Sequence, residues 1–240
     1  MTRELGERGG IAQVGYRLRF AASVREFKRE VDSPRFGGVL SVRAETGQYL
    51  PDWRNGRDYR ATASARGESG GGVLRELSHE IDYLRWIFGD IEWLSAWCGK
   101  QSDLEIDVED TVHLTLGFAS KSSLPAFVGQ LHLDFMRHDR TRSITAVCAR
   151  GTLRWDGITL RVEEWPQGGA GWEVTYAEEA STPTSYERQW DSFYSAVTKG
   201  ATPEVTVEDG LAVLSVIDSA RSSHDSAGIR VSPPHTGFSS

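Results

Sequence analysis

A period-two alternation of apolar residues through the second half of the chain most constrains its fold. Two stretches show it most clearly, and the apolar residues that share a face are Val112, Leu114, Leu116 and Phe118 in one and Phe127, Leu131, Leu133 and Phe135 in the other. Such alternation predicts strands that bury one face. Further strands are predicted over residues 11–20, 39–45, 144–148, 152–155, 158–162 and 172–176. Short turns join most strands of the second half, which requires these neighbours to pair antiparallel.

Apolar residues spaced three and four apart predict helices between and after these strands. Residues 1–8 resemble the end of a helix that stops at Gly9-Gly10. A second helix opens at Ser23 with a capping-box pattern to Glu26, and its buried stripe is Val24, Phe27 and Val31. A third covers residues 73–88, with the stripe Val73, Leu77, Ile81, Leu84 and Phe88.

Two more helices are predicted to close the fold. The helix over residues 185–199 is expected to point Tyr186, Trp190, Phe193 and Val197 inward. The helix over residues 207–221 begins after Thr206, with Asp209 in its first turn. The tail after Ser222 is predicted to be loosely held. The predicted fold class is therefore α+β, with a large, mainly antiparallel open sheet and its helices packed on one face.

Charge and composition exclude several classes of function. The net charge of −7 argues against nucleic-acid binding, which needs a basic surface. Arg137, Arg140 and Arg142 are interspersed with Asp139, and we interpret them as a solvated turn. No apolar run is long enough to span a membrane, and residues 1–10 lack the apolar core of a signal peptide. Two cysteines are too few for a disulfide framework, which favours the cytoplasm.

The stretch with the most chemical content begins at Gly70-Gly71-Gly72 and continues into the predicted helix. On that helix Glu76, His79, Glu80 and Tyr83 share one side, next to the apolar stripe. A histidine with a carboxylate one turn away can be oriented and tuned near neutral pH as a general acid or base. A solvated histidine and glutamate are the alternative interpretation of the same pattern. The loop over residues 47–70 is long, and loops of this length are usually functional.

Several motifs, in order, resemble the Gfo/Idh/MocA oxidoreductases. The glycine-rich entry, His79, Ile81-Asp82 and Trp86-Ile87-Phe88-Gly89 are similar to the segment that carries the catalytic histidine of that family. Residues 14–20 resemble the strand that leaves its cofactor domain, and residues 47–53 with 58–60 resemble the substrate loop of a branch acting on sugars or nucleotide sugars. Residues 107–110 and 151–156 resemble its strand markers. The resemblance extends from about residue 5 to residue 232.

The resemblance implies roles for individual residues. His79, accompanied by Glu76, would exchange a proton with the substrate hydroxyl while hydride passes to or from a nicotinamide. Trp53, Arg57, Tyr59, Arg60 and Tyr83 would contact a sugar-type substrate. Many relatives place an Asp four residues before the histidine, whereas this chain has Arg75 there and Glu76 next to it.

The dinucleotide-binding half of such an enzyme is not recognisable in these residues. Gly168-Gly169-Ala170-Gly171 lacks the third glycine and the following helix of a G-x-G-x-x-G turn, and the Glu-Lys-Pro segment with the family's catalytic lysine does not occur. We therefore interpret residues 1–16 as the last helix and strand of a Rossmann domain, residues 17–232 as the C-terminal domain and residues 233–240 as a flexible tail. No cofactor site is predicted in this chain, and NAD(P) is expected only with a Rossmann partner.

Three hypotheses follow from this deficit. The chain is half of a split enzyme completed by a separate Rossmann-domain chain, or a non-catalytic sugar-binding or assembly module, or an N-terminally truncated gene product. The resemblance also implies a homo- or hetero-oligomer through the open sheet face. His113 and His132 lie on polar faces of predicted adjacent strands near Asp134. We interpret them as interface or solvated histidines in preference to a metal site, so no metal site is predicted.

Overall fold

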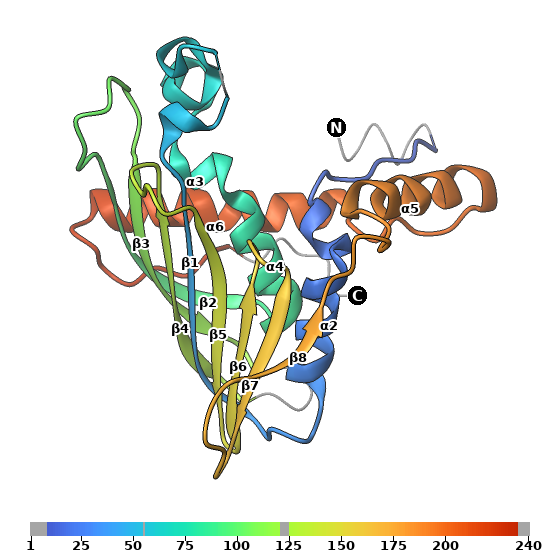
Figure 1. Ribbon diagram of the computed structural model, residues 1–240. Coiled ribbons are helices and arrows are strands. Elements are labelled where there is room, and N and C mark those ends of the chain that lie inside the picture. The colour runs from blue at the N-terminus through green and yellow to red at the C-terminus, as the bar shows by residue number, and fades with distance from the viewer. Residues whose placement is uncertain (1–8, 55, 121–124, 235–240) are drawn as a thin grey trace.

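Eight strands form one open sheet in the order β2-β3-β4-β1-β5-β6-β7-β8 (Figure 1). The computed structural model describes residues 9–54, 56–120 and 125–234. The strands are β1 (Val39–Gly47), β2 (Ile91–Gly99), β3 (Thr111–Phe118), β4 (Phe127–Asp134), β5 (Thr141–Cys148), β6 (Gly151–Asp156), β7 (Arg161–Pro166) and β8 (Glu173–Ala177). Only β1 and β4 pair parallel among these strands; the other neighbours pair antiparallel.

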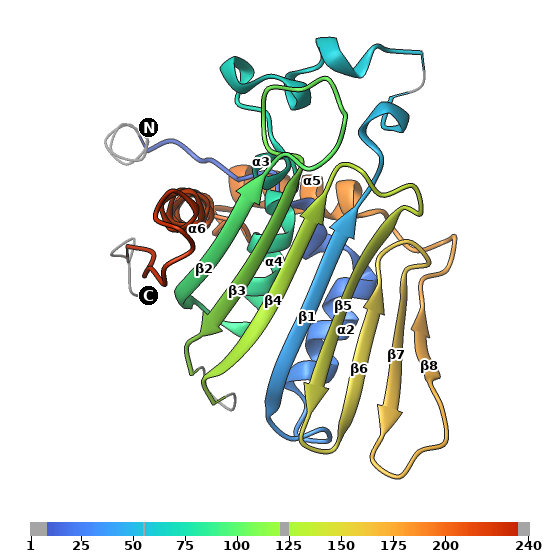
Figure 2. The same ribbon diagram turned by 90° about the vertical axis from the view of Figure 1, so that its left-hand side faces the viewer.

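The helices lie to one side of this sheet and leave its other face bare, as Figure 2 shows. They are α2 (Ala22–Asp32), α3 (Val73–Glu76), α4 (Ser78–Phe88), α5 (Ser185–Lys199) and α6 (Val207–Asp225). Between β1 and α3, short 3-10 turns occupy much of residues 50–69. The predicted α+β architecture is confirmed. None of the helices in the described ranges combines the length and apolar character that crossing a bilayer would require.

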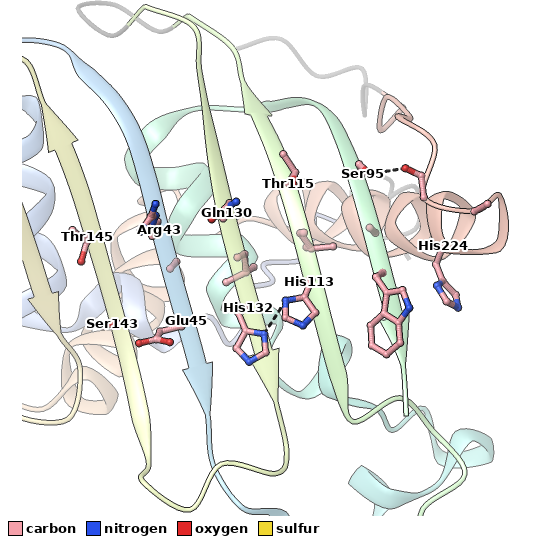
Figure 3. A pocket seen from close by; sticks show the side chains of 17 residues that line it. Arg43, Glu45, Ser95, His113, Thr115, Gln130, His132, Ser143, Thr145 and His224 are labelled. Carbon is pink, nitrogen blue, oxygen red and sulfur yellow. Dashed lines mark hydrogen bonds between the residues drawn. The ribbon is translucent and has the colours of Figure 1, made fainter. Parts of the chain in front are cut away.

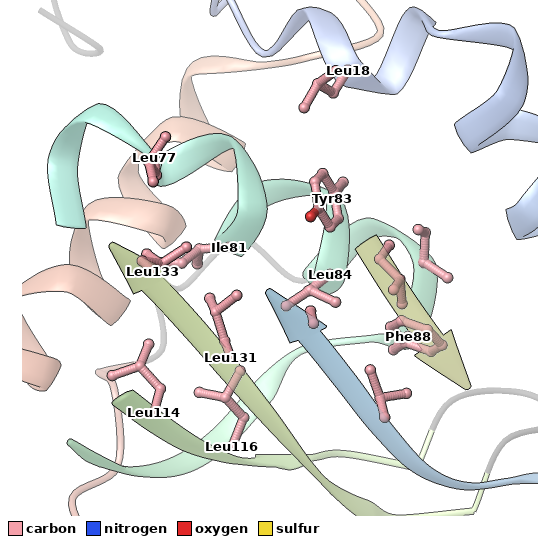
Figure 4. Close-up of a cluster of buried hydrophobic side chains, with 14 of the residues drawn as sticks. Leu18, Leu77, Ile81, Tyr83, Leu84, Phe88, Leu114, Leu116, Leu131 and Leu133 are labelled. Atoms are coloured by element: carbon pink, nitrogen blue, oxygen red, sulfur yellow. The ribbon is translucent and has the colours of Figure 1, made fainter. Parts of the chain in front are cut away.

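The core lies between α4 and the middle of the sheet (Figure 4). Ile81, Leu84 and Phe88 of α4 are fully buried, as are the inward residues of β3 and β4. The ring of Phe88 meets Phe118 at 5.9 Å and Phe127 at 5.8 Å, in edge-to-face contacts. Burying a side chain of this size stabilises the fold by about 1.5–3 kcal/mol. The alternating apolar residues of β3 and β4 thus form the sheet surface on which α4 packs.

The N-terminal segment differs from its predicted strand over residues 11–20. Residues 10–16 have no regular structure, and η1 (Arg17–Phe20) is a 3-10 helix. A strand needs a neighbour, and the backbone N–H of Val14 instead donates to the carbonyl of Val205 at 3.0 Å. The helix end predicted for residues 1–8 lies outside the described residues.

Two further boundaries are corrected by the structure. The strand predicted over residues 158–162 is mostly a turn, because the Asp156 carboxylate accepts the N–H groups of Ile158 and Thr159 and reverses the chain before β7. The tail after Ser222 is not loose at its start. There α6 continues to Asp225, and Val231 pairs with Leu94 of β2, a strand outside the predicted ranges.

Helix starts are predicted correctly where a side chain truly caps the backbone. Thr206 and Asp209 form the expected reciprocal cap of α6. The capping box at Ser23 is wrong, since α2 begins one residue earlier and Glu26 pairs with Arg29 instead. The buried stripe of α2 is nonetheless as predicted, because Val24, Phe27 and Val31 are all buried.

Candidate active site

His79 stands in the first turn of α4, immediately after a break in the helix. The single helix predicted over residues 73–88 is wrong. It is divided at Leu77, whose backbone leaves the helical region with φ −101° and ψ 28°. The break places Glu76 at the end of α3 and His79 in the first turn of α4, and the predicted role of Glu76 beside His79 stays a prediction. The carboxylate whose charge acts on His79 is Glu80.

The surroundings of His79 keep its imidazole neutral. The ring of Tyr16 packs edge-on against it at 5.4 Å, and its Nδ1 is buried without a hydrogen-bond partner among the described residues. Burial lowers the pKa of His79, the charge of Glu80 acts in the opposite direction, and Arg142 and Arg17 lower it further. A half-buried neutral imidazole can accept a proton at neutral pH, and Nε2 is the nitrogen left for a ligand to reach.

A buried ion pair lies behind this histidine. Glu80 is fully buried, and its Oε1 accepts hydrogen bonds from Nε of Arg142 at 2.8 Å and from Oγ1 of Thr46 at 3.0 Å. The interpretation of Arg142 as part of a solvated turn is wrong. Its parity in β5 matches that of Ile144 and Ala146, which point inward, and this parity was the available signal in the sequence. Arg137, by contrast, does pair near the surface, with Glu45 and Asp139.

Tyr83 cannot contact a substrate in this structure. Its side chain is fully buried, and its ring meets that of Trp155 edge-on at 5.7 Å. Tyr83 follows Glu80 by three residues, so both face the sheet with the apolar stripe. Tyr83, which the sequence predicted to contact substrate, is therefore a core residue. Fewer residues lie on the polar side of α4 than the sequence indicated.

Only some of the loop residues predicted to bind substrate lie together in one pocket. Trp53, Arg57 and Tyr59 line one small pocket together with Leu50 and Ser64. Trp53 is held edge-on against Phe135 at 5.1 Å and donates from Nε1 to the carbonyl of Gln48. Its position is therefore fixed by packing, while its neighbour in the pocket Arg57 is exposed.

Arg60 faces away from this pocket. Its guanidinium pairs with Asp58 and with Glu105 at 3.0 Å, and all three side chains are exposed. The hydroxyl of Tyr59 accepts the N–H of Glu105, so the loop is tied to the segment before β3. The structure thus gives Arg60 a role in holding the loop, and substrate contact by Arg60 stays a prediction.

A second buried ion cluster fixes α4 in place. Arg19 of η1 forms a bidentate pair with Asp82 of α4, with nitrogen to oxygen distances of 2.7 and 2.9 Å, and also reaches Asp209 of α6 at 3.0 Å. Burial raises the pKa of Asp82 to about 6, although Arg19 pulls in the opposite direction. Asp82 therefore remains ionised at neutral pH and joins three elements around the start of α4.

Comparison with known families agrees with this architecture. The model for the GFO/IDH/MocA C-terminal domain matches residues 24–154, more than half of the chain. The chain belongs to the Gfo/Idh/MocA family. By that description, the Gfo/Idh/MocA domain present here is the one at the C-terminal side of these oxidoreductases. Among curated proteins, none matches the chain significantly.

Solved structures share the fold at low sequence identity. Levoglucosan dehydrogenase in complex with NADH and levoglucosan superposes with a TM-score of 0.79 at 17% identity, over 95% of this chain and 68% of that one. The WlbA dehydrogenase from Bordetella pertussis, with NADH and UDP-GlcNAcA, gives 0.76 at 20% identity, over 97% and 67%. Aldose-aldose oxidoreductase from Caulobacter crescentus, complexed with glycerol, gives 0.76 at 21%, over 95% and 65%. The chain thus spans about two thirds of the length of these enzymes.

Proposed function

We propose that this chain is the substrate-side half of an NAD(P)-dependent oxidoreductase acting on a sugar or nucleotide sugar. In this proposal His79 takes up or returns the proton of the reacting hydroxyl, and the loop with Trp53, Arg57 and Tyr59 contacts the sugar. Its support is the membership in the Gfo/Idh/MocA family and the neutral, half-buried imidazole of His79. Two of the solved structures named above hold NADH together with levoglucosan or UDP-GlcNAcA, which is consistent with this substrate class.

We propose that the cofactor site of the complete enzyme lies outside the described residues. Gly168 to Gly171 lie in the turn between β7 and β8, two antiparallel strands, whereas a pyrophosphate turn joins a strand to a helix. When bound in the complete enzyme, a nicotinamide supplies the hydride acceptor or donor. We propose that a Rossmann domain outside these residues holds it, and that the chain by itself is inactive.

One observation carries the proposal of a docked partner domain: the apolar stripe of α5 faces outward. The sequence predicted Tyr186, Trp190, Phe193 and Val197 to point into the core, and this is wrong for Tyr186, Trp190 and Val197, whereas Phe193 is half-buried. Tyr186 and Trp190 are 65% and 64% exposed, and Val197 is 54% exposed. A groove of about 290 Å³ runs between this stripe and Gln13 of the N-terminal segment. A contiguous aromatic surface of this kind is typical of a docking site.

This surface adjoins His79 through the N-terminal segment. The guanidinium of Arg17 stacks over the ring of Tyr186 at 4.9 Å, and its Nη1 donates to Oγ of Ser185 at 3.1 Å. The charge of Arg17 also acts on His79, whose ring packs against neighbouring Tyr16. A domain seated on α5 would therefore lie next to the imidazole, which is where hydride transfer requires the nicotinamide.

The experiment is co-expression of the chain with a separate dinucleotide-binding domain encoded beside its gene. We expect a stable complex and sugar-dependent reduction of NAD(P)⁺, assayed with levoglucosan and with a UDP-hexuronic acid. His79→Asn should keep the complex and lower the rate at least about 100-fold, as removal of a general acid or base does. Trp190→Glu should prevent the complex. Turnover by the chain alone, or an active complex that tolerates His79→Asn, would exclude this function.

We also propose that the protein works in the cytoplasm and as an oligomer through the bare face of its sheet. Both cysteines, Cys98 and Cys148, are free and buried, which suits a reducing compartment. The bare face carries exposed apolar side chains, among them Val128 and Val147. These two proposals are independent of the assignment of His79.

A further inference from the structure

A row of side chains crosses the bare face of the sheet, opposite the face on which α4 packs (Figure 3). Strand register places Trp97 of β2 opposite His113 of β3, His113 opposite His132 of β4, and His132 opposite Glu45 of β1. All four line a hollow of about 950 Å³ together with residues of β5 and the end of α6. Because α4 packs on the opposite face, this row is separate from the candidate active site.

The two histidines of the row face each other through the same ring atom. Nδ1 of His113 lies 3.2 Å from Nδ1 of His132, and the ring centroids are 4.5 Å apart with the planes inclined by 33°. His113 is exposed, while His132 is half-buried. Two nitrogens at this separation need either a shared proton or a shared electrophile, since two lone pairs alone repel each other.

Asp134 fixes how His132 presents its ring. Nε2 of His132 lies 3.0 Å from Oδ2 of Asp134, whose carboxylate is almost completely buried. Burial alone would raise the pKa of Asp134, but the hydrogen bonds from His132 and from the amides of Met136 and Arg137 hold it below its usual value. The ionised carboxylate therefore accepts Nε2–H, which leaves the lone pair of His132 Nδ1 directed at His113.

This is the arrangement in which metal-binding histidines are usually held. A ligating imidazole commonly donates its other N–H to a carboxylate, which sets the tautomer and strengthens the ligand. With metal–nitrogen distances of about 2.0–2.1 Å and a tetrahedral angle, two ligand nitrogens stand about 3.3–3.4 Å apart. The observed 3.2 Å requires almost no movement of either ring.

We propose that His113 and His132 form a two-imidazole site for a divalent transition-metal ion such as Zn²⁺, with Asp134 as the carboxylate that orients His132. His113 takes the Nε2–H tautomer when the ion binds. The described residues bring no group of three or more histidine, cysteine, aspartate or glutamate ligands together. Glu45, beside His132, is occupied by Arg137 at 2.9 Å. Water or a second copy of the pair therefore fills the remaining positions of the ion.

The test is titration of the purified full chain with Zn²⁺ by calorimetry and with Co²⁺ by visible absorption. We expect saturation at one ion per chain, or at one per two chains if a second pair completes the site. His113→Ala and His132→Ala should each lower the affinity at least tenfold. His138→Ala, which removes an exposed histidine of the loop after β4, should leave it unchanged. Asp134→Asn should weaken binding by about 10-fold to 100-fold while both imidazoles remain.

Circular dichroism of each variant separates loss of the site from loss of the fold. If folded His113→Ala and His132→Ala chains bind Zn²⁺ as tightly as the parent, or if the parent does not saturate, the proposal is wrong. The pair would then be joined only by a shared proton. An equal loss in His138→Ala would likewise place the ion elsewhere and overturn the assignment.

Discussion

Glu80 carries a carboxylate where no water reaches it, and a single guanidinium compensates its charge. At the scale of residues, removing Arg142 should therefore show how much this buried pair contributes to stability. The Arg142 side chain is 14% exposed and Glu80 is completely buried. A buried charge left without its partner is expensive, whereas an exposed pair contributes little.

We therefore predict that Arg142→Ala lowers the free energy of unfolding by about 3–5 kcal/mol. The matched control is Arg60→Ala, which breaks the exposed pairs with Asp58 and Glu105 and should cost less than about 1 kcal/mol. Urea unfolding monitored by tryptophan fluorescence measures both. Equal losses in the two variants would mean that Glu80 is solvated or protonated in the folded chain.

His79 gives a second prediction at this scale, from the cause of its lowered pKa. In an NMR titration we expect the folded chain to protonate His79 below pH 6.5, the value of a free imidazole. Tyr16→Ala removes the ring that covers it and should raise the pKa of His79 toward 6.5. Because the unfolded chain binds this proton more readily, His79 lowers stability as the pH falls through 6.5 and into the range of its folded pKa.

A value for His79 that stays fixed after Tyr16→Ala would show that Arg17 and Arg142, and not burial, set it.

Among elements, the turn into α3 depends on a glycine. Gly72 has φ +106°, and a Cβ there would collide with the carboxylate of Glu109. Gly168 has φ +77° in the β7–β8 turn, but nothing lies within 4 Å of its Cβ position. The two positions therefore differ in steric contact and in backbone strain, because Gly72 also has ψ 148°, in a region that is almost closed to residues with a side chain. The clash, in addition, would displace the start of α3 and with it the approach to His79.

We predict that Gly168→Ala costs about 1–2 kcal/mol, from strain alone. Gly72→Ala should cost about 2–4 kcal/mol, because overpacking adds to strain. Thermal unfolding of the two variants gives the comparison. If both lose the same amount, neither the backbone at Gly72 nor its contact with Glu109 holds the start of α3, and the prediction is wrong.

The helix α5 shows where sequence patterns mislead. Its bounds and its aromatic stripe were predicted, but the direction of the stripe was not, because periodicity gives a helix an apolar face without saying what covers it. Helical spacing was equally insufficient for Tyr83. Its hydroxyl group suggested that it lies on the polar side of the helix, but the residue packs against Trp155 in the core. The strands β3 and β4 were predicted almost to the residue, because every second side chain in them is apolar and is buried on the helix-covered face of the sheet.

The break at Leu77 and the pair of Glu80 with Arg142 could not be predicted in the same way. The first lies in the stretch Glu76-Leu77-Ser78, which contains no glycine or proline to indicate a helix break. The second joins residues 62 positions apart in the sequence. Parity within β5 would have shown that Arg142 points inward, but not which carboxylate receives it. Sequence motifs thus identified the candidate site residues, whereas the contacts of these residues became known only from the structure.

For the whole molecule, the bare sheet face is the feature with the largest consequence for assembly. Register aligns Gly117, Val128, Ser41 and Val147 in one row across the middle of the sheet. Val128 and Val147 are 45% and 42% exposed. We predict that the parent chain self-associates and that Val128→Glu with Val147→Glu gives a monomer, measured by sedimentation velocity.

Trp190→Glu is the control for that measurement. It places one added negative charge on α5, on the other side of the molecule, and should leave self-association intact with a change in stability within about 0.5 kcal/mol. A parent chain that stays monomeric at high concentration would show that the sheet face serves another purpose.

The position of β1 has a consequence for how the polypeptide is made. This first strand ends in the middle of the sheet, between β4 and β5, whose residues are 127–134 and 141–148. During synthesis, residues 39–47 leave the ribosome before either neighbour exists, because β4 begins 80 residues after Gly47 and β5 follows it. Both edges of an apolar segment are exposed for that interval, which invites mispairing. Efficient production of this protein should therefore depend on chaperones that shield its N-terminal third during translation.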